Sequence, residues 1–240
     1  IPISLITILD ASTDKTCNAP DTGGSQAADI HGKAIQVCCE RLLTGLRPIL
    51  KEEPDWKKAV LKAYNMKLPL QASEHIRIER EKYGIAEHSS TYQTSGAACI
   101  VSEIDCRTGE HQLLSVDIVM DVGRSLNPAV DIGQIEGAFM QSYGNFTCEE
   151  LTYDDKGKLV EDSLYKYKLP TPAMTPKKFR VKLLKESDCF EGQVYSSKGI
   201  GEPPMMLGVG TYASLRYAIR SRRADLRLPG LVSLPGSTNS

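Results

Sequence analysis

The segment 96–121 constrains the fold most, because two β-rich runs flank a tight-turn signal there. The turn sequence is CRTGE, in which Gly109 is available for the positive φ angle that tight turns require. Two such runs predict a β-hairpin, and a hairpin requires antiparallel pairing. The segment 178–185 alternates like a further strand with one buried face.

The sequence before the hairpin combines one strand signal with two helix signals. Residues 3–9 are β-branched and apolar, which favours a buried strand. A polar, glycine-containing loop follows to about Gln26, and apolar residues then recur at helical spacing from Ala27 to about Leu50. A second helix is predicted over 55–65, with Asp55 as N-cap. Its expected buried side carries Trp56, Val60, Leu61 and Tyr64.

The sequence after the hairpin predicts two more helices. One is expected over 131–147, beginning at Asp131, and the other over 205–223, with arginines in a last turn that suit the helix dipole. Between them, YDDKG is a second hairpin signal. Because strands and helices alternate irregularly and the hairpins are antiparallel, the predicted class is α+β, not a doubly wound parallel sheet.

Composition narrows the classes of partner. A chain of 240 residues with 41% hydrophobic content can bury a core, and its net charge of -1 gives no reason to expect nucleic acid or an anionic membrane as partner. No stretch approaches the roughly 20 apolar residues of a membrane helix. Residues 1–12 lack the basic flank and cleavage site of a signal peptide. We therefore expect a small-molecule ligand and a chain cut from something longer.

The seven cysteines are odd in number and form no C-x-x-C pair. This pattern favours free thiols in a reducing, cytoplasmic compartment. It also argues against a zinc or iron–sulfur site held by this chain, since such sites need several thiolates at short intervals.

Three loops are candidate ligand sites, and the first is 22–26, with the sequence TGGSQ. Paired glycines before a helix let the backbone approach an oxyanion, and the helix start presents free N–H groups. A flexible turn with Ser25 as helix cap explains the same residues, and both interpretations stay open.

The second candidate is 131–137, which places Gln134 and two acids in the first turns of an apolar helix. Gln134 can donate and accept hydrogen bonds at once. The structural alternative is that Asp131 caps the helix, Gly137 permits close packing and Gln134 binds a neighbouring backbone group.

The third candidate is 197–204, SKGIGEPP, in which glycines allow an irregular backbone and prolines stiffen the segment after Glu202. The alternative role for Glu202 is an acid favoured by a helix dipole. A carboxylate that acts as a base near neutral pH would need desolvation to offset that dipole.

Four segments occur together in this order: TGGSQAAD, DIVMDVGRSLNPAVDIGQIEGAFMQ, EELTYDDKGKL and SSKGIGEPPM. Over about residues 1–224 they resemble the molybdenum-binding domain of the xanthine dehydrogenase and aldehyde oxidase family. The resemblance implies a domain of two lobes, roughly 1–95 and 96–224, that covers the last half of a larger cofactor domain. The Pro-, Gly- and Ser-rich tail 225–240 is expected to be disordered.

The resemblance also implies roles for individual residues. Gly23, Gly24 and Ser25 would lie at the pterin and metal end of a molybdenum–molybdopterin cofactor, whose metal is held through the pterin dithiolene. Gln134 would hydrogen-bond the cofactor, and Glu202 would be the catalytic base. Lys198, Gly199, Ile200 and Gly201 would form the adjoining wall.

The implied reaction is hydroxylation of an aldehyde or a purine-like N-heterocycle with water as oxygen source. Glu202 would take a proton from a hydroxyl on molybdenum, and hydride would pass to a sulfido ligand. Electrons would leave through 2Fe-2S clusters and FAD, both expected in the missing N-terminal domains, to NAD or dioxygen. The family also implies a homodimer. Ser142, Tyr143 and Asn145 replace glycines and leucines that are usual in the family.

A different class of function fits the same residues. A chain without the other cofactor half and the redox centres can be an inactive fragment or a degenerate paralogue that serves as a binding or structural module. The sequence upstream of residue 1 distinguishes the two hypotheses, because only the enzyme requires the missing domains.

Overall fold

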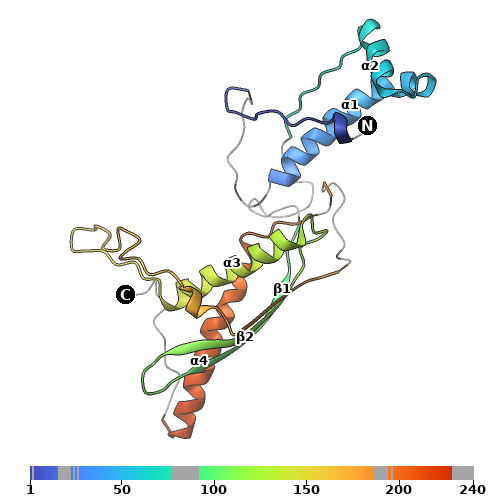
Figure 1. Ribbon diagram of the computed structural model, residues 1–240. Coiled ribbons are helices and arrows are strands. Elements are labelled where there is room, and N and C mark those ends of the chain that lie inside the picture. Colours follow the sequence, from blue (N-terminus) through green and yellow to red (C-terminus); the bar gives the residue numbers. More distant parts are fainter. Residues whose placement is uncertain are drawn as a thin grey trace. The chain divides into compact units, whose positions relative to one another are not determined.

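The structure is a computed structural model in which the chain forms two compact units (Figure 1). Unit 1 contains residues 1–91 and 191–194, and unit 2 contains residues 92–190 and 195–240. The structure describes residues 1, 3–15, 23, 25, 27–76, 92–185, 187, 194–195 and 197–228.

The start of unit 1 is not the predicted strand. Ile3–Leu5 form a 3-10 turn, η1, and residues 6–12 have no regular structure. The side chain of Ile8 is 94% exposed. Among the described residues this segment has no neighbouring strand, and a strand without a partner leaves its backbone groups unpaired. The prediction from the apolar pattern was therefore wrong.

Two helices dominate unit 1, as predicted. Helix α1 runs over Ala27–Glu52 and α2 over Trp56–Asn65. Asp55 is the N-cap of α2, and its carboxylate accepts a hydrogen bond of 2.9 Å from the Lys58 N–H. This cap fixes where α2 begins.

The buried side of α2 matches the prediction only in part, because Trp56 packs against the buried cluster but Leu61 and Tyr64 do not. Leu46 and Ile49 of α1 pack with Ala59 and Ala63 of α2, both of which are fully buried. Small side chains at the contact let the two helices approach closely. The larger Leu61 and Tyr64 of α2, which were expected inside, are 60% and 69% exposed.

Unit 2 contains a three-stranded sheet with the order β1-β2-β3. Strands β1, Gly96–Ile104, and β2, His111–Met120, form the predicted antiparallel hairpin, and Gly109 in the turn has φ 80°. Strand β3, Lys178–Leu183, has the predicted alternation but pairs in parallel with β2. The sheet is therefore mixed, within an α+β fold.

Helix α3, Pro128–Thr147, connects β2 to β3 and begins three residues before the predicted start. Asn127 is its N-cap, with a side chain that accepts from the Ala129 N–H at 3.2 Å. Pro128 occupies the first helical turn, where its missing N–H has no cost. Asp131 is therefore inside the helix and does not cap it.

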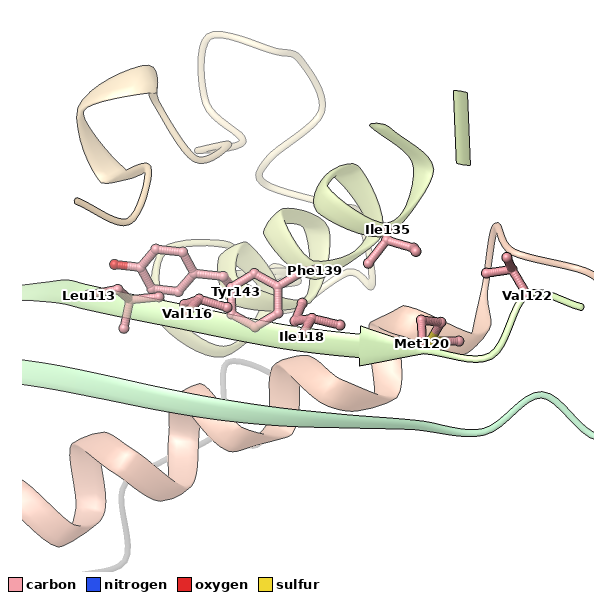
Figure 2. Packing of buried hydrophobic residues seen from close by; sticks show 8 residues of the cluster. All are labelled: Leu113, Val116, Ile118, Met120, Val122, Ile135, Phe139 and Tyr143. Carbon is pink, nitrogen blue, oxygen red and sulfur yellow. The ribbon is translucent and has the colours of Figure 1, made fainter. Parts of the chain in front are cut away.

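The core of unit 2 lies between β2 and α3. Because side chains alternate along a strand, β2 directs one set of apolar residues toward the helix. Figure 2 shows this packing, with the strand residues below the helix residues. The fully buried members of this cluster are Leu113, Val116, Ile118, Met120, Val122, Ile135, Phe139 and Tyr143.

The segment from Pro203 onward closes this core. Pro203–Gly208 form a 3-10 segment, η4, and α4 follows over Val209–Asp225, so the predicted helix starts later than expected. A Cβ on Gly208 would lie 2.2 Å from Ser142 Oγ of α3, and a Cβ on Gly210 would lie 2.6 Å from Ile100 of β1. Gly208 is therefore required for close packing of this segment, whereas at Gly210 the end of the Ile100 side chain could move aside.

The second predicted hairpin is reduced to a single bridge between Tyr153 and Leu159, around a turn in which Gly157 has φ 76°. A short 3-10 segment, η3, follows at Pro172–Met174. Residues 229–240, most of the expected disordered tail, lie outside the described residues. No helix in the described part of the chain has the length and apolar character to cross a membrane.

The cysteines within the described ranges are all free thiols, as predicted: Cys38, Cys39, Cys99, Cys106 and Cys148. Cys17 and Cys189 lie outside those ranges.

Candidate cofactor-binding site

One face of α3 is exposed and lacks side-chain cover. Gly133, Gln134 and Gly137 are all accessible there. Within the described part of the chain, a Cβ added to either glycine would meet no atom within 4 Å, so Gly137 does not serve close packing there. In the described part of the chain the Gln134 amide binds no protein group. Its donor and acceptor are both available to a ligand.

The buried side chain of Asp131 anchors the first turns of α3. Its side chain is only 7% exposed and accepts a hydrogen bond from the Ser125 hydroxyl. This contact ties the segment that follows β2 to the first turns of α3. It therefore fixes the turn of helix that carries Gln134.

The loop 197–202 begins as an extension of the sheet beside the end of β2. Ser197 forms an antiparallel bridge with Gly123, and the Lys198 N–H donates to the Val122 carbonyl at 3.0 Å. Backbone pairing thus joins the loop to the residues that lead from β2 into α3.

Lys198 turns its side chain into the protein. Its ammonium group lies 2.5 Å from a carboxylate oxygen of Asp121, and the two side chains are 6% and 13% exposed. Burial by itself raises the pKa of Asp121. Hydrogen bonds from Lys198, Gly123 and Ser187, and the charge of Lys198, outweigh burial and hold this pKa below its usual range.

The next two loop residues are also anchored. The Gly199 N–H donates to the Tyr92 hydroxyl at 2.8 Å, and Thr94 donates to the Gly199 carbonyl at 3.4 Å. Ile200 is partly buried and packs against the core cluster. Tyr92 and Thr94 were not predicted as site residues, because residues 66–95 are mostly polar and show no clear period that would distinguish them.

Glu202 follows this anchored stretch and is exposed. It precedes η4 as its N-cap residue, and its side chain makes no capping hydrogen bond. Among the described residues, the N–H groups of Ile200, Gly201 and Glu202 donate to no protein acceptor. The loop therefore offers an accessible carboxylate next to several free backbone donors.

The first candidate loop belongs to unit 1. Gly23 and Ser25 are described, and Ser25 has φ 57°, a strained value for a residue with a side chain. Gly24, Thr22 and Gln26 lie outside the described residues. The structure thus places Gln134 and residues 198–202 in unit 2, while the role of Gly23, Gly24 and Ser25 stays a prediction.

The residues of unit 2 fit a polar, anionic cofactor. Free N–H groups suit phosphate or pterin oxygens, a free amide suits a hydrogen-bonding ring edge, and the two open glycines leave space for a flat group. The Lys198 ammonium does not contribute to this set, because Asp121 already holds it.

Comparison with known proteins agrees with this chemistry. The model of the molybdopterin cofactor-binding domain family matches residues 1–176, which include Gln134 but not Glu202. A probable aldehyde oxidase of Caenorhabditis elegans is 51% identical over 89% of this chain. The xanthine dehydrogenase of Drosophila pseudoobscura pseudoobscura is 42% identical over 100% of this chain. The chain spans only 17% and 18% of the length of these two relatives.

Solved structures show the same fold. An aldehyde oxidoreductase from Desulfovibrio gigas matches 87% of this chain and 22% of its own, with a TM-score of 0.62 and 21% identity. A Cu,Mo-CO dehydrogenase matches 93% of this chain and 30% of its own, with a TM-score of 0.62 and 19% identity. Because the family model matches residues 1–176 and the Caenorhabditis elegans and Drosophila relatives are 51% and 42% identical, the chain belongs to the molybdopterin cofactor-binding domain family of the xanthine dehydrogenases and aldehyde oxidases.

Proposed function

We propose that this chain is the part of a molybdenum hydroxylase that supplies the catalytic base and one wall of the cofactor site. The substrate is an aldehyde or an electron-poor N-heterocycle, and water is the source of the oxygen that is added. Membership of the family supports the cofactor, and the names of the relatives, xanthine dehydrogenase and aldehyde oxidase, support these two substrate classes.

The observation that carries the proposal is the state of Glu202. Its carboxylate is exposed and uncapped, although the residues on both sides of it are anchored by hydrogen bonds or packing. An acid that only stabilised a helix start would accept hydrogen bonds from the first turn. A carboxylate on an anchored stretch of backbone, with its own oxygens free of protein partners, is instead suited to take a proton from a reacting group.

The other residues of the site bind the cofactor and orient it. Gln134 donates to and accepts from the cofactor, and the N–H groups of Ile200, Gly201 and Glu202 bind its anionic or carbonyl oxygens. When bound, the cofactor supplies a two-electron redox centre at molybdenum. Glu202 then accepts the proton of the oxygen nucleophile at its carboxylate and holds it while the substrate carbon is hydroxylated.

The substitution Glu202→Gln in the full-length protein tests the base. It keeps the size and hydrogen-bonding capacity of the side chain but removes the basic oxygen, so turnover should fall roughly 10²–10⁴-fold. Molybdenum and pterin content should stay at the wild-type level. Steady-state kinetics with an aldehyde and a purine, together with elemental analysis, measure both.

The matched control is Glu150→Gln, which changes another exposed glutamate of unit 2 in the same way. It should leave turnover and cofactor content unchanged. Near-normal turnover of Glu202→Gln in a molybdenum-loaded protein would remove Glu202 from the role of base.

A further inference from the structure

We infer that Lys198 is a positioning residue that fixes the Glu202 loop through Asp121 and does not bind cofactor or substrate with its ammonium group. The inference rests on the proposed role of Glu202. It departs from the simplest expectation for a lysine in a cofactor wall, which is direct contact with an anionic ligand.

The Lys198 side chain is enclosed by the protein. With 6% of its side chain exposed, Lys198 presents no charge at the surface where Glu202 lies. The other ion pairs of unit 2 are far more open, and in the pair of Arg180 with Asp117 the side chains are 62% and 41% exposed. A buried pair keeps one geometry, because separating it would leave two unpaired charges in a poorly solvated place.

The contacts of Asp121 reach both segments that border the site. The Asp121 carboxylate receives the Lys198 ammonium and also the Gly123 N–H, at 2.9 Å. Gly123 in turn pairs with Ser197. One carboxylate therefore holds both the turn that leads toward α3 and the start of the loop that leads to Glu202.

Only a short length of chain separates the fixed points around Glu202. Gly199 is bound by Tyr92, and Pro204 and Gly208 of η4 are buried. Between them, Ile200 also packs on the core. Gly201 and Glu202 therefore have little freedom once Lys198 is in place. Only three residues, 199–201, lie between Lys198 and Glu202, so we expect a shift at Lys198 to reach Glu202.

The test uses the full-length protein with the variants Lys198→Met, Asp121→Asn and the double variant. Methionine keeps the aliphatic length, and asparagine keeps the shape of the carboxylate. Each single variant should lower kcat roughly 10- to 100-fold, because misplacement of a catalytic group by about 1 Å costs that much. KM and molybdopterin content should change little. The double variant should be no worse than either single variant, since both remove the same link.

A second readout does not depend on activity. Hydrogen exchange of peptides from 197–202, followed by mass spectrometry, reports whether the Gly199 N–H stays bound to Tyr92. All three variants should speed exchange there, in cofactor-loaded and in cofactor-free protein alike. The control Asp117→Asn breaks the exposed pair with Arg180 on the neighbouring strand and should change neither exchange nor kcat.

The outcomes separate positioning from direct binding. If Lys198→Met loses molybdopterin while Asp121→Asn keeps it, or if the two losses of kcat multiply, then Lys198 contacts the ligand and the inference is overturned. Unchanged exchange in both single variants overturns it as well. If a single variant fails to fold, the double variant decides, because it leaves no buried charge without a partner.

Failure of the proposed function gives a different pattern. In that case Glu202→Gln retains normal turnover, or the wild-type protein contains no molybdenum. Faster exchange in the Lys198 and Asp121 variants would then still support the positioning network.

Discussion

Lys198 and Asp121 show how a single buried contact can be important for stability as well as for geometry. Removing one charge leaves the other in the protein interior without a partner, which typically costs about 3–5 kcal/mol. The exposed pair of Arg180 and Asp117 contributes little by comparison, because solvent screens its charges. Unit 2 therefore depends more on this one buried pair than on its surface ion pairs.

His111 is a second residue with unusual surroundings. Its ring packs edge-on against Tyr143, with centroids 5.8 Å apart, and its Nε2 is buried without a protein partner among the described residues. Burial lowers the pKa of His111 below the ordinary value of 6.5 and raises the pKa of Tyr143 to about 12. Both shifts favour the neutral forms in the folded state.

The lowered pKa of His111 predicts acid sensitivity of unit 2. The folded state binds the proton less well than the unfolded state, so stability is full above about pH 6.5 and falls as the pH drops below that value. The loss is at most about 1.4 kcal/mol per pH unit. His111→Phe keeps the ring contact and should flatten this dependence in urea unfolding at about pH 7 and about pH 5.

His31, exposed on α1, provides the control for this experiment. His31→Phe should leave the difference between the two pH values as it is in the wild-type chain. An unchanged difference in His111→Phe would mean that other groups cause the acid sensitivity.

At the scale of elements, α3 has two faces with different tasks. One face buries Ile135, Phe139 and Tyr143 in the core, while the opposite face leaves Gly133 and Gly137 open. Glycine inside a helix destabilises it by roughly 0.5–1 kcal/mol relative to alanine. Two open glycines in one helix are thus a cost to stability that ligand binding would explain.

The substitution Gly137→Ala tests this explanation. Without ligand it should stabilise the chain by roughly 0.5–1 kcal/mol, because nothing obstructs the added methyl group. In the full-length protein it should reduce molybdopterin content, since the methyl group occupies space that the cofactor needs. Urea unfolding and pterin analysis measure the two effects.

Gly45→Ala is the matched control, because Gly45 also lies inside a helix, α1, with no atom within 4 Å of an added Cβ. It should stabilise the chain without any change in cofactor content. Normal molybdopterin content in Gly137→Ala would show that the cofactor does not lie on this face of α3.

The elements that could be predicted are those whose signals are local. The hairpin 96–121, α1 and the cap of α2 at Asp55 each follow from spacing or from a turn or cap residue within a few positions. The strand expected at 3–9 failed because strand formation depends on a partner elsewhere in the chain. Parallel pairing of β3 was missed for the same reason.

In the candidate site, too, only the residues with a local sequence signal could be predicted. Motifs within one loop pointed to Gln134 and to 198–202, and the structure places these residues in one unit. The partners that hold the loop, Asp121 and Tyr92, lie 77 and 107 residues from the residues they bind. No local pattern in the sequence reports such distant contacts.

At the scale of the whole molecule, the chain is a small part of its relatives, with 17% of the length of the aldehyde oxidase it matches. We propose that the full-length protein also carries 2Fe-2S clusters and FAD outside this chain, and that it forms a homodimer. The seven scattered cysteines of this chain form no cluster motif, which favours iron sites in other parts of the full-length protein.

Elemental analysis of the native protein tests this organisation. Protein captured with an antibody to this chain should contain molybdenum and iron and should be several times longer than 240 residues. Size-exclusion chromatography with light scattering should give twice the mass of that polypeptide. A polypeptide of this length that contains neither metal would instead support the inactive fragment or paralogue.

The parallel pairing of β2 with β3 also has a consequence for how the chain folds. The β1–β2 hairpin closes a short turn and can form within about 1–10 μs. Asp117 and Arg180 of the β2–β3 pair are separated by 63 residues, including all of α3, so β3 joins only after a long loop has closed. Until then this edge of β2 is unpaired, and during synthesis it is open to misassembly with other chains.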